Sequence, residues 1–315
     1  MFFVRIKKVN FHRLELKWKQ QAKTIAGGNG QGDELNQLKH PRGIYVDHKQ
    51  QSIYIADSDN HRIVKWKLGE NDGDIVAGGN GEGGRIDQLN RPSDVIVDQN
   101  NKSLIICDWG NRRVVRWSLQ NPTNKQVIIP NISCFGLMMN ENGDLFVSDY
   151  EKHEVRRWRK DEIGEQGTIV AGGNGEGGQL NQLSWPTFLF IDREETVYVS
   201  DSDNHRVMKW LKGAREGIVV AGGQGQGNNL KRLNQAEGLI VNEVGDVYVA
   251  DYGNNRIMCW SPGCEEGRVV FGGNGRGERS NQFSYPMGLS FDIKNNLYVG
   301  DCENHRIQQF SVDKN

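Results

Sequence analysis

The chain of 315 residues has little proline and few cysteines, its net charge is only −1, and it lacks a long apolar run. Without a stretch of 18 apolar residues, no membrane-spanning helix is expected. Only 7 prolines and the absence of a Gly-X-Y period exclude collagen. The 39 basic and 40 acidic side chains argue against a whole-molecule attraction to nucleic acid or a membrane, although a local patch stays open.

The five cysteines do not form the pattern of a disulfide framework or a zinc module. Their number is odd, they are scattered over strand-like segments, and no Cys-x-x-Cys pair occurs, so no zinc finger or RING module is encoded. The apolar run at the N-terminus is too short for a signal-peptide core, and lysines follow it rather than precede it. We therefore expect a reduced, soluble, cytoplasmic protein.

Glycine is abundant, at 39 residues, and it accompanies an internal repeat. In each copy an aspartate ends a strand-like segment, and a bulky aromatic stands nine residues later. The copies are 50 to 52 residues apart, except for a step of 41 between Asp108 and Asp149. The aspartates are Asp57, Asp108, Asp149, Asp201, Asp251 and Asp301, and the aromatics are Trp66, Trp117, Trp158, Trp210, Trp260 and Phe310. Strand-rich repeats of this length are typical of propeller blades, so six copies predict six blades.

Each unit contains four short runs with the alternation of strands, such as "GIYVD", "SIYIAD", "RIVKW" and "DIVAGG". A four-stranded sheet buries both faces only by stacking between neighbours, so we predict a closed, all-β ring of antiparallel blades. The last unit lacks a fourth strand, and "KTIAGG" at residues 23–28 precedes the first unit. Residues 23–28 are therefore expected to close the last blade of a propeller that spans 23–315, and residues 1–22 form an N-terminal extension of unknown role.

The unit "HPRGIYVD…SIYIADSDNHRIVKW…DIVAGGNGEG" resembles the NHL repeat, whose turn carries Asn-His-Leu. Asn-His stands at residues 60–61, 204–205 and 304–305, whereas the other three turns depart from it. The resemblance implies a six-bladed propeller that serves as a binding platform. In tripartite-motif-type ubiquitin ligases such propellers hold substrates or RNA beside a RING module, which implies a substrate-recognition role in an assembly of that type. A lyase that releases amidated peptides has a related fold.

The Asp-x-x-Asn-His-Arg turn has a catalytic and a structural interpretation. The first makes it a metal or acid–base site, and the second makes the aspartate an acceptor for turn amides. Six equivalent copies favour structure, since catalysis needs one asymmetric site.

The glycine loops lack a following "GK[ST]" and a helix, so we expect turns rather than a nucleotide site. The variable turn positions are the better candidates for partner contacts: Asp59, Trp109, Tyr150, Asp203, Tyr252 and Glu303.

Two departures from symmetry give further candidates. The third unit is preceded by "KQVIIPNISCFG" with no glycine loop, which predicts a notch between blades 2 and 3. Basic residues near it form a possible RNA patch: Arg112, Arg113, Arg116, Lys152, Arg156, Arg157, Arg159 and Lys160. Aligned inner strands place a chemically mixed ring at the channel mouth: Arg42, Ser93, Phe135, Thr187, Glu237 and Met287. This ring has no histidine and one carboxylate, too few for a metal cage or a paired-carboxylate mechanism.

These observations favour a monomeric, non-catalytic domain without cofactor or metal, which captures a protein or peptide partner around the channel mouth and the notch. Two alternatives stay open. One is single-stranded RNA binding through the basic side of blades 2 and 3, which would weaken steeply with salt. The other is an enzyme of the lactonase or lyase type.

Overall fold

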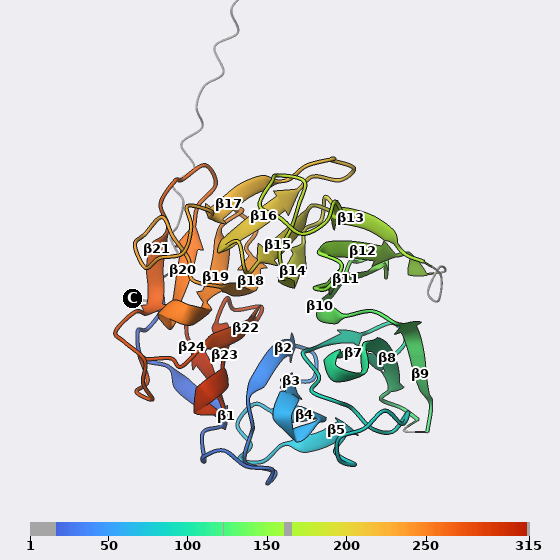
Figure 1. The fold of residues 1–315 in the computed structure, drawn as a ribbon. Helices are drawn as coiled ribbons and strands as arrows, with labels where there is room; N and C mark the ends of the chain where they lie inside the picture. Colours follow the sequence, from blue (N-terminus) through green and yellow to red (C-terminus); the bar gives the residue numbers. More distant parts are fainter. Residues whose placement is uncertain (1–16, 122, 161–165, 314–315) are drawn as a thin grey trace, which may run out of the picture.

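The computed structural model describes residues 17–121, 123–160 and 166–313, and the strands form six four-stranded antiparallel sheets arranged in a ring (Figure 1). Blade 1 contains β2 (Pro41–Asp47), β3 (Ser52–Asp57), β4 (Arg62–Lys67) and β5 (Asp74–Gly78). Blade 2 contains β6 (Asp94–Asp98), β7 (Ser103–Asp108), β8 (Arg113–Ser118) and β9 (Lys125–Pro130). Blade 3 contains β10 (Cys134–Met139), β11 (Leu145–Asp149), β12 (Glu154–Trp158) and β13 (Thr168–Gly172). The six-bladed propeller is thereby confirmed.

The second half of the ring repeats this order. Blade 4 contains β14 (Pro186–Ile191), β15 (Val197–Asp201), β16 (Arg206–Trp210) and β17 (Ile218–Gly222). Blade 5 contains β18 (Ala236–Val241), β19 (Val247–Asp251), β20 (Arg256–Trp260) and β21 (Arg268–Gly272). Blade 6 contains β22 (Pro286–Phe291), β23 (Leu297–Asp301), β24 (Arg306–Phe310) and, from the start of the chain, β1 (Lys23–Gly27). Four single-turn 3-10 segments, η1 (Ser58–Asn60), η2 (Trp109–Asn111), η4 (Tyr252–Asn254) and η5 (Cys302–Asn304), follow strand-ending aspartates.

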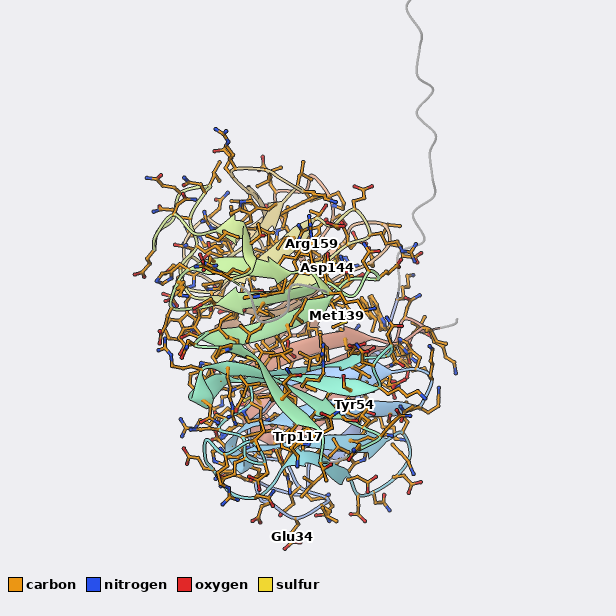
Figure 2. The ribbon with its side chains drawn as sticks, turned by 90° about the vertical axis from the view of Figure 1, so that its right-hand side faces the viewer. Glu34, Tyr54, Trp117, Met139, Asp144 and Arg159 are labelled. Carbon is orange, nitrogen blue, oxygen red and sulfur yellow. A yellow bond between two sulfur atoms is a disulfide. The ribbon has the colours of Figure 1, made fainter. Side chains whose placement is uncertain are left out.

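The second strand of every blade is buried along its whole length, because a neighbouring blade covers each face of the sheet. The apolar clusters accordingly combine residues of adjacent blades, as where Tyr54 of blade 1 packs with Leu104 of blade 2. The recurring aromatics are anchors of these interfaces, and Trp210 and Trp260 are almost fully buried. In the edge-on view from blades 2 and 3, the strands run from one face of the ring to the other (Figure 2). Equivalent turns of successive blades therefore lie on the same face.

The ring closes as expected, because β1 pairs antiparallel with β24 and completes blade 6. The residues just before β1 also pack against the propeller. Trp18 is 5% exposed, lies edge-on to Tyr248 and Phe271, and donates its indole N–H to the carbonyl of Asn295. The remainder of the N-terminal extension, residues 1–16, lies outside the described residues. No helix among the described residues is long and apolar enough to cross a membrane.

The expectation that all thiols are reduced is wrong for two of the five. Cys107 of β7 and Cys134 of β10 form a disulfide between blades 2 and 3. Their separation of 27 residues gave no signal in the sequence, but the ring sets these two strands side by side, with Cα atoms 5.8 Å apart. Among the described residues Cys259, Cys264 and Cys302 form no disulfide, and Cys264 is exposed.

Candidate functional site

The strand-ending aspartate of blade 1 is the centre of a buried hydrogen-bond network. Asp57 is fully buried, and its Oδ2 accepts the Nε–H of Arg62 at 2.6 Å and the Nδ2–H of Asn60 at 2.8 Å. Its Oδ1 accepts the backbone amide of Lys39 from the preceding loop at 2.6 Å. Arg62 also donates to three loop carbonyls, those of residues 33, 34 and 37. The network therefore locks the turn to the loop that enters the same blade.

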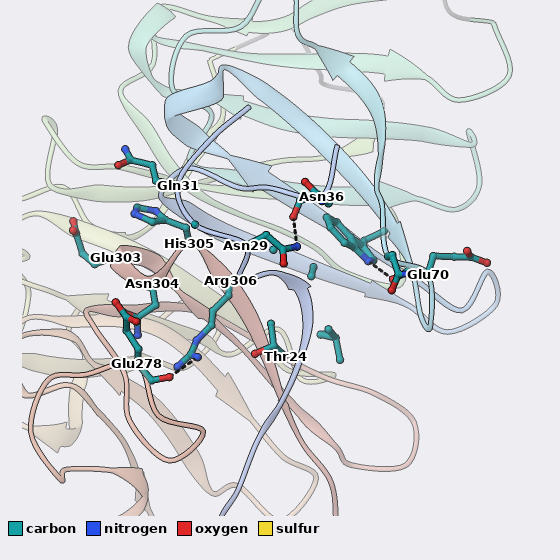
Figure 3. A pocket seen from close by; sticks show the side chains of 17 residues that line it. Thr24, Asn29, Gln31, Asn36, Glu70, Glu278, Glu303, Asn304, His305 and Arg306 are labelled. Carbon is teal, nitrogen blue, oxygen red and sulfur yellow. Dashed lines mark hydrogen bonds between the residues drawn. The ribbon is translucent and has the colours of Figure 1, made fainter. Parts of the chain in front are cut away.

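Four other blades repeat this lock. The aspartate accepts the arginine Nε–H at 2.6–2.7 Å and a loop amide at 2.7 Å in blades 2, 4, 5 and 6. In blade 6 the guanidinium of Arg306 reaches the carbonyl of Glu278 (Figure 3). Burial raises the pKa of Asp301, and the paired Arg306 opposes that shift. Every acceptor and donor at the centre of the lock is engaged within the fold, which is the arrangement of a structural element.

The histidine of the turn has a different partner. His61 lies in the left-handed region at φ 52°, and its Nδ1 accepts the backbone amide of Arg91 in the loop that enters blade 2. His153, His205 and His305 accept the equivalent amides of Trp185, Gln235 and His40, and Asn255 does so for Tyr285 through its Oδ1. Each side chain thus fixes one loop residue of the next blade. We refer to these five loop residues as the rim residues: His40, Arg91, Trp185, Gln235 and Tyr285.

The rim residues hold a backbone conformation that bulky side chains rarely adopt. Their φ angles are 46–58°, which is a strained region for non-glycine residues, and such strain is enriched at functional sites. The hydrogen bond that each backbone amide donates to the preceding blade holds the rim residue in this conformation. Sequence reasoning missed these positions; the available signal was a large polar or aromatic residue immediately before the first residue of an inner strand, as in Trp185–Pro186 and Tyr285–Pro286.

The rim residues meet the variable turn residues that the sequence singled out. Trp185 packs against Tyr150 with ring centroids 4.6 Å apart, and Tyr285 packs against Tyr252 at 4.7 Å. Trp185 is 39% exposed. On the opposite side of the mouth, Asp59 accepts a hydrogen bond from His40 Nδ1 at 2.6 Å and lies 3.6 Å from Arg91. The mouth therefore has aromatic pairs at the junctions of blades 3 and 4 and of blades 5 and 6, and an ionic group around Asp59 of blade 1.

The predicted channel-mouth ring lies one layer below this rim. Ser93, Phe135, Thr187, Glu237 and Met287 are all buried, and Arg42 is half-buried. The Arg42 guanidinium lies 4.9 Å from the ring of Trp109 and 5.8 Å from that of Phe135. Phe135 and Met287 belong to an apolar cluster with Tyr150, Phe188 and Cys302 that fills this end of the channel. The ring residues other than Arg42 support the mouth from beneath rather than line its surface.

Glu237 is the charged member of that buried layer. Its Oε1 accepts a hydrogen bond from Ser202 at 3.1 Å, and its Oε2 accepts none among the described residues. Burial raises its pKa to about 7, and the bond from Ser202 and the charge of Arg42 only partly oppose this. Another buried carboxylate near the channel, Asp94, was not anticipated. It accepts the amides of Val95 and Leu137 and borders a cavity of about 140 Å³ inside the channel, and burial raises its pKa to about 7.

The notch predicted between blades 2 and 3 corresponds to a pocket of about 240 Å³. Its walls come from Pro130 at the end of β9, from Ile132 of the connection into blade 3, and from Asp149, Lys152 and Arg156 of blade 3 itself. A larger cleft of about 870 Å³ lies at the ring closure between blades 6 and 1 (Figure 3). Among its ionisable residues, His305 and Arg306 belong to contacts already described, and Glu303 lies 3.4 Å from His40 Nε2.

The proposed RNA patch is largely neutralised in the fold. Six of its eight members lie within 4.0 Å of a carboxylate: Arg112, Arg113, Arg116, Lys152, Arg156 and Arg157. The pair Arg113–Asp108 is mostly buried and belongs to the structural lock of blade 2. Among the described residues, no three His, Cys, Asp or Glu side chains are placed to hold one metal ion.

Comparison with known proteins identifies two of the repeats. The family model of the NHL repeat matches residues 38–66 and 283–310, and with the six blades this shows that the chain is an NHL-repeat β-propeller. No curated protein matches the sequence.

Several solved structures share the fold. An auxiliary nutrient binding protein from Bacteroides thetaiotaomicron is 16% identical, with a TM-score of 0.72 over 95% of this chain and 78% of its own. A gluconolactonase from Xanthomonas campestris is 12% identical, with a TM-score of 0.65 over 94% of this chain and 100% of its own. A catalytically inactive virginiamycin B lyase from Staphylococcus aureus, with quinupristin, is 13% identical, with a TM-score of 0.60 over 94% and 100%. At these identities the likeness is one of fold, which binding proteins and enzymes share.

Proposed function

We propose that this protein is a non-catalytic binding platform that captures a protein or peptide partner around the channel mouth and the adjoining notch. The observation that carries the proposal is the rim. Five loop residues in strained backbone conformations are pinned by the turn side chains, and two of them form aromatic pairs with turn residues. Tyrosine, tryptophan and arginine are the side chains enriched where proteins bind one another.

The combination of aromatic pairs and an ionic group at the mouth supports a peptide ligand. Trp185 and Tyr285 offer apolar faces for side chains, and Arg91, with a half-exposed side chain, offers a charged contact. A rigid ring needs little rearrangement to bind, since the rim backbone is held by hydrogen bonds before a ligand arrives. The neutralised basic patch makes RNA the weaker candidate, and no feature of the rim favours turnover of a lactone.

The test is selection from a displayed library of random 12-residue peptides. The rim variant carries Trp185→Ser with Tyr285→Ser, and the matched control carries Val244→Ser with Ile293→Ser, which are exposed residues of the opposite face. Peptides selected on the wild type are expected to bind the rim variant at least about tenfold more weakly, since buried aromatic anchors contribute more than 1 kcal/mol each. Equal affinity for the rim variant and the wild type would refute the proposal.

A further inference from the structure

The connection into blade 3 lacks the loop that completes the lock in every other blade. Residues 131–133 join β9 to β10, whereas residues 173–185 join β13 to β14. In blade 1 the long loop donates the Lys39 amide to Asp57 and accepts N–H groups from Asn60 and Arg62. Blade 3 therefore has neither the loop donor nor the loop acceptors.

The sequence of blade 3 has changed to match the missing acceptors. Lys152 stands where the other locks have asparagine, and Glu154 stands where they have arginine. These changes remove two buried donors that would otherwise have no carbonyl to bind. The turn of blade 2 has changed as well, because Arg112 replaces the histidine or asparagine that would pin a rim residue.

The aspartate itself has been kept. Asp149 is 1% exposed, and its Oδ1 accepts the Lys152 amide at 3.1 Å. Its Oδ2 accepts no hydrogen bond among the described residues, and the Lys152 ammonium lies 3.8 Å away. A buried carboxylate oxygen without a donor is costly, because desolvation is not compensated. The side chains that would donate to the missing loop carbonyls have thus been replaced. The aspartate that would accept the missing loop amide has been kept.

Asp149 lines the notch pocket of about 240 Å³, and its Oδ2 is buried beneath the pocket surface. Arg156 is bound to Glu154 at 2.5 Å and is mostly buried, so it is committed to a partner. Lys152 is 56% exposed on a flexible stem, so its ammonium can leave Asp149 when a better donor arrives. The notch therefore presents one buried acceptor, Asp149 Oδ2, beside the ammonium of the exposed Lys152 side chain.

We propose that the notch accepts an arginine side chain from a loop or tail of the partner protein, with its guanidinium donating to Asp149 Oδ2. This inference rests on the proposed function and identifies the chemistry of one contact. In five blades the same position is filled by the chain's own guanidinium, with Nε–H donating to the aspartate Oδ2. An incoming arginine restores that bond, and its planar set of donors suits a carboxylate better than the single ammonium it displaces.

The first test uses the capped tripeptide Ac-Gly-Arg-Gly-NH2, with the lysine and glutamate analogues as controls, titrated by NMR against the intact chain. The arginine peptide is expected to bind most tightly and to shift signals of residues 130–132 and 149–156. Asp149→Asn is expected to weaken binding about tenfold or more, as for loss of a charged hydrogen bond. Lys152→Ala leaves the turn backbone unchanged and is expected to tighten binding, because it removes the competing cation.

The second test closes the notch. Residues 131–133 are replaced by the sequence of residues 173–185, together with Lys152→Asn and Glu154→Arg, so that blade 3 regains a complete lock. Arginine-peptide binding is expected to disappear while the melting temperature is kept or raised. The rim variant of the library experiment is expected to bind the tripeptide normally, which separates failure of the notch from failure of the rim.

Four outcomes would overturn the inference, three of them in the peptide titrations. These three are equal binding by the wild type and Asp149→Asn, undiminished binding by a folded closed-notch variant, and preference for the glutamate peptide. Binding of a single-stranded oligouridylate that strengthens in Asp149→Asn would assign the notch to an anion and would overturn it as well.

Discussion

Blades 1 and 3 have the same strand order and the same buried aspartate, yet they hold that aspartate in different ways. Asp57 has three donors, from Asn60, Arg62 and the loop amide of Lys39. Asp149 has one backbone donor and an ammonium at 3.8 Å. The difference shows that the repeated turn is a structural lock whose parts are lost together. Where the loop is absent, its partner side chains are absent too.

The interface that lacks the loop is held by another link. The Cys107–Cys134 disulfide joins the second strand of blade 2 to the inner strand of blade 3. The chain thus exchanges a hydrogen-bonded loop for a covalent bond at one of its six interfaces. That exchange leaves room on the surface for the notch while the ring stays closed, and the following predictions test it.

The largest contrast is expected from removing the two aspartates. Asp57→Ala leaves Arg62 buried without its carboxylate, which should lower the free energy of unfolding by about 3–5 kcal/mol. Asp149→Ala should cost about 1 kcal/mol, since one hydrogen bond is lost and no buried cation is stranded. Denaturant unfolding of both variants measures the difference. Similar losses for the two would show that contacts other than these hydrogen bonds lock the turn of blade 3.

The disulfide should matter nearly as much. Closing a loop of 27 residues stabilises the fold by about 3–4 kcal/mol in the chain-entropy description. The double variant Cys107→Ser, Cys134→Ser, or the wild type under reductant, should therefore melt several degrees lower. Cys264→Ser changes only an exposed free thiol and serves as the control. An unchanged melting temperature under full reduction would mean that packing alone holds the interface between blades 2 and 3.

Glu237 gives a second buried carboxylate with one oxygen that accepts no hydrogen bond, and it should respond to pH. Its folded-state pKa of about 7 lies above the usual 4.5, because burial disfavours the charged carboxylate. The contribution of Glu237 to stability is therefore most favourable at low pH, where its carboxyl group is neutral, and that contribution is lost as pH rises through 7. Glu237→Gln should leave stability unchanged at pH 4 and raise it by about 2–3 kcal/mol at pH 8. Thermal melts across this range, with exposed Glu216→Gln as control, measure the effect. A parallel pair of pH profiles would contradict it.

The smallest effect is expected at the histidines that pin the rim. Asn255 shows that asparagine can replace histidine, because its Oδ1 accepts the Tyr285 amide at 2.9 Å. His205→Asn should therefore change stability by less than about 0.5 kcal/mol, and His205→Ala should cost about 1–2 kcal/mol from the lost bond and the left-handed backbone. Hydrogen exchange of the Gln235 amide reports the same bond directly. Equal stability of the two variants would mean that the hydrogen bond of the Gln235 amide does not hold the rim.

The candidate site could be predicted from the sequence in part. The turn residues Tyr150 and Tyr252, the notch and the shorter third unit followed from breaks in the repeat, because a repeat makes each departure visible. The rim residues Trp185 and Tyr285 were missed, since their importance comes from a hydrogen bond that crosses to the preceding blade. The burial of Ser93 and Thr187 was missed because strand alternation assigns a face to each residue but not its depth within a closed channel.

The repeat by itself determined the six blades, the closing strand and the structural character of the Asp turns. Its period-2 runs can bury both faces only by stacking into a ring, so local pattern and global fold point to one answer. The tertiary structure alone decided the disulfide, the layer at which the mouth residues lie and the vacant acceptor of Asp149. Each of these depends on which residues of different blades come within a few ångströms of one another, and that distance is set by the closure of the ring.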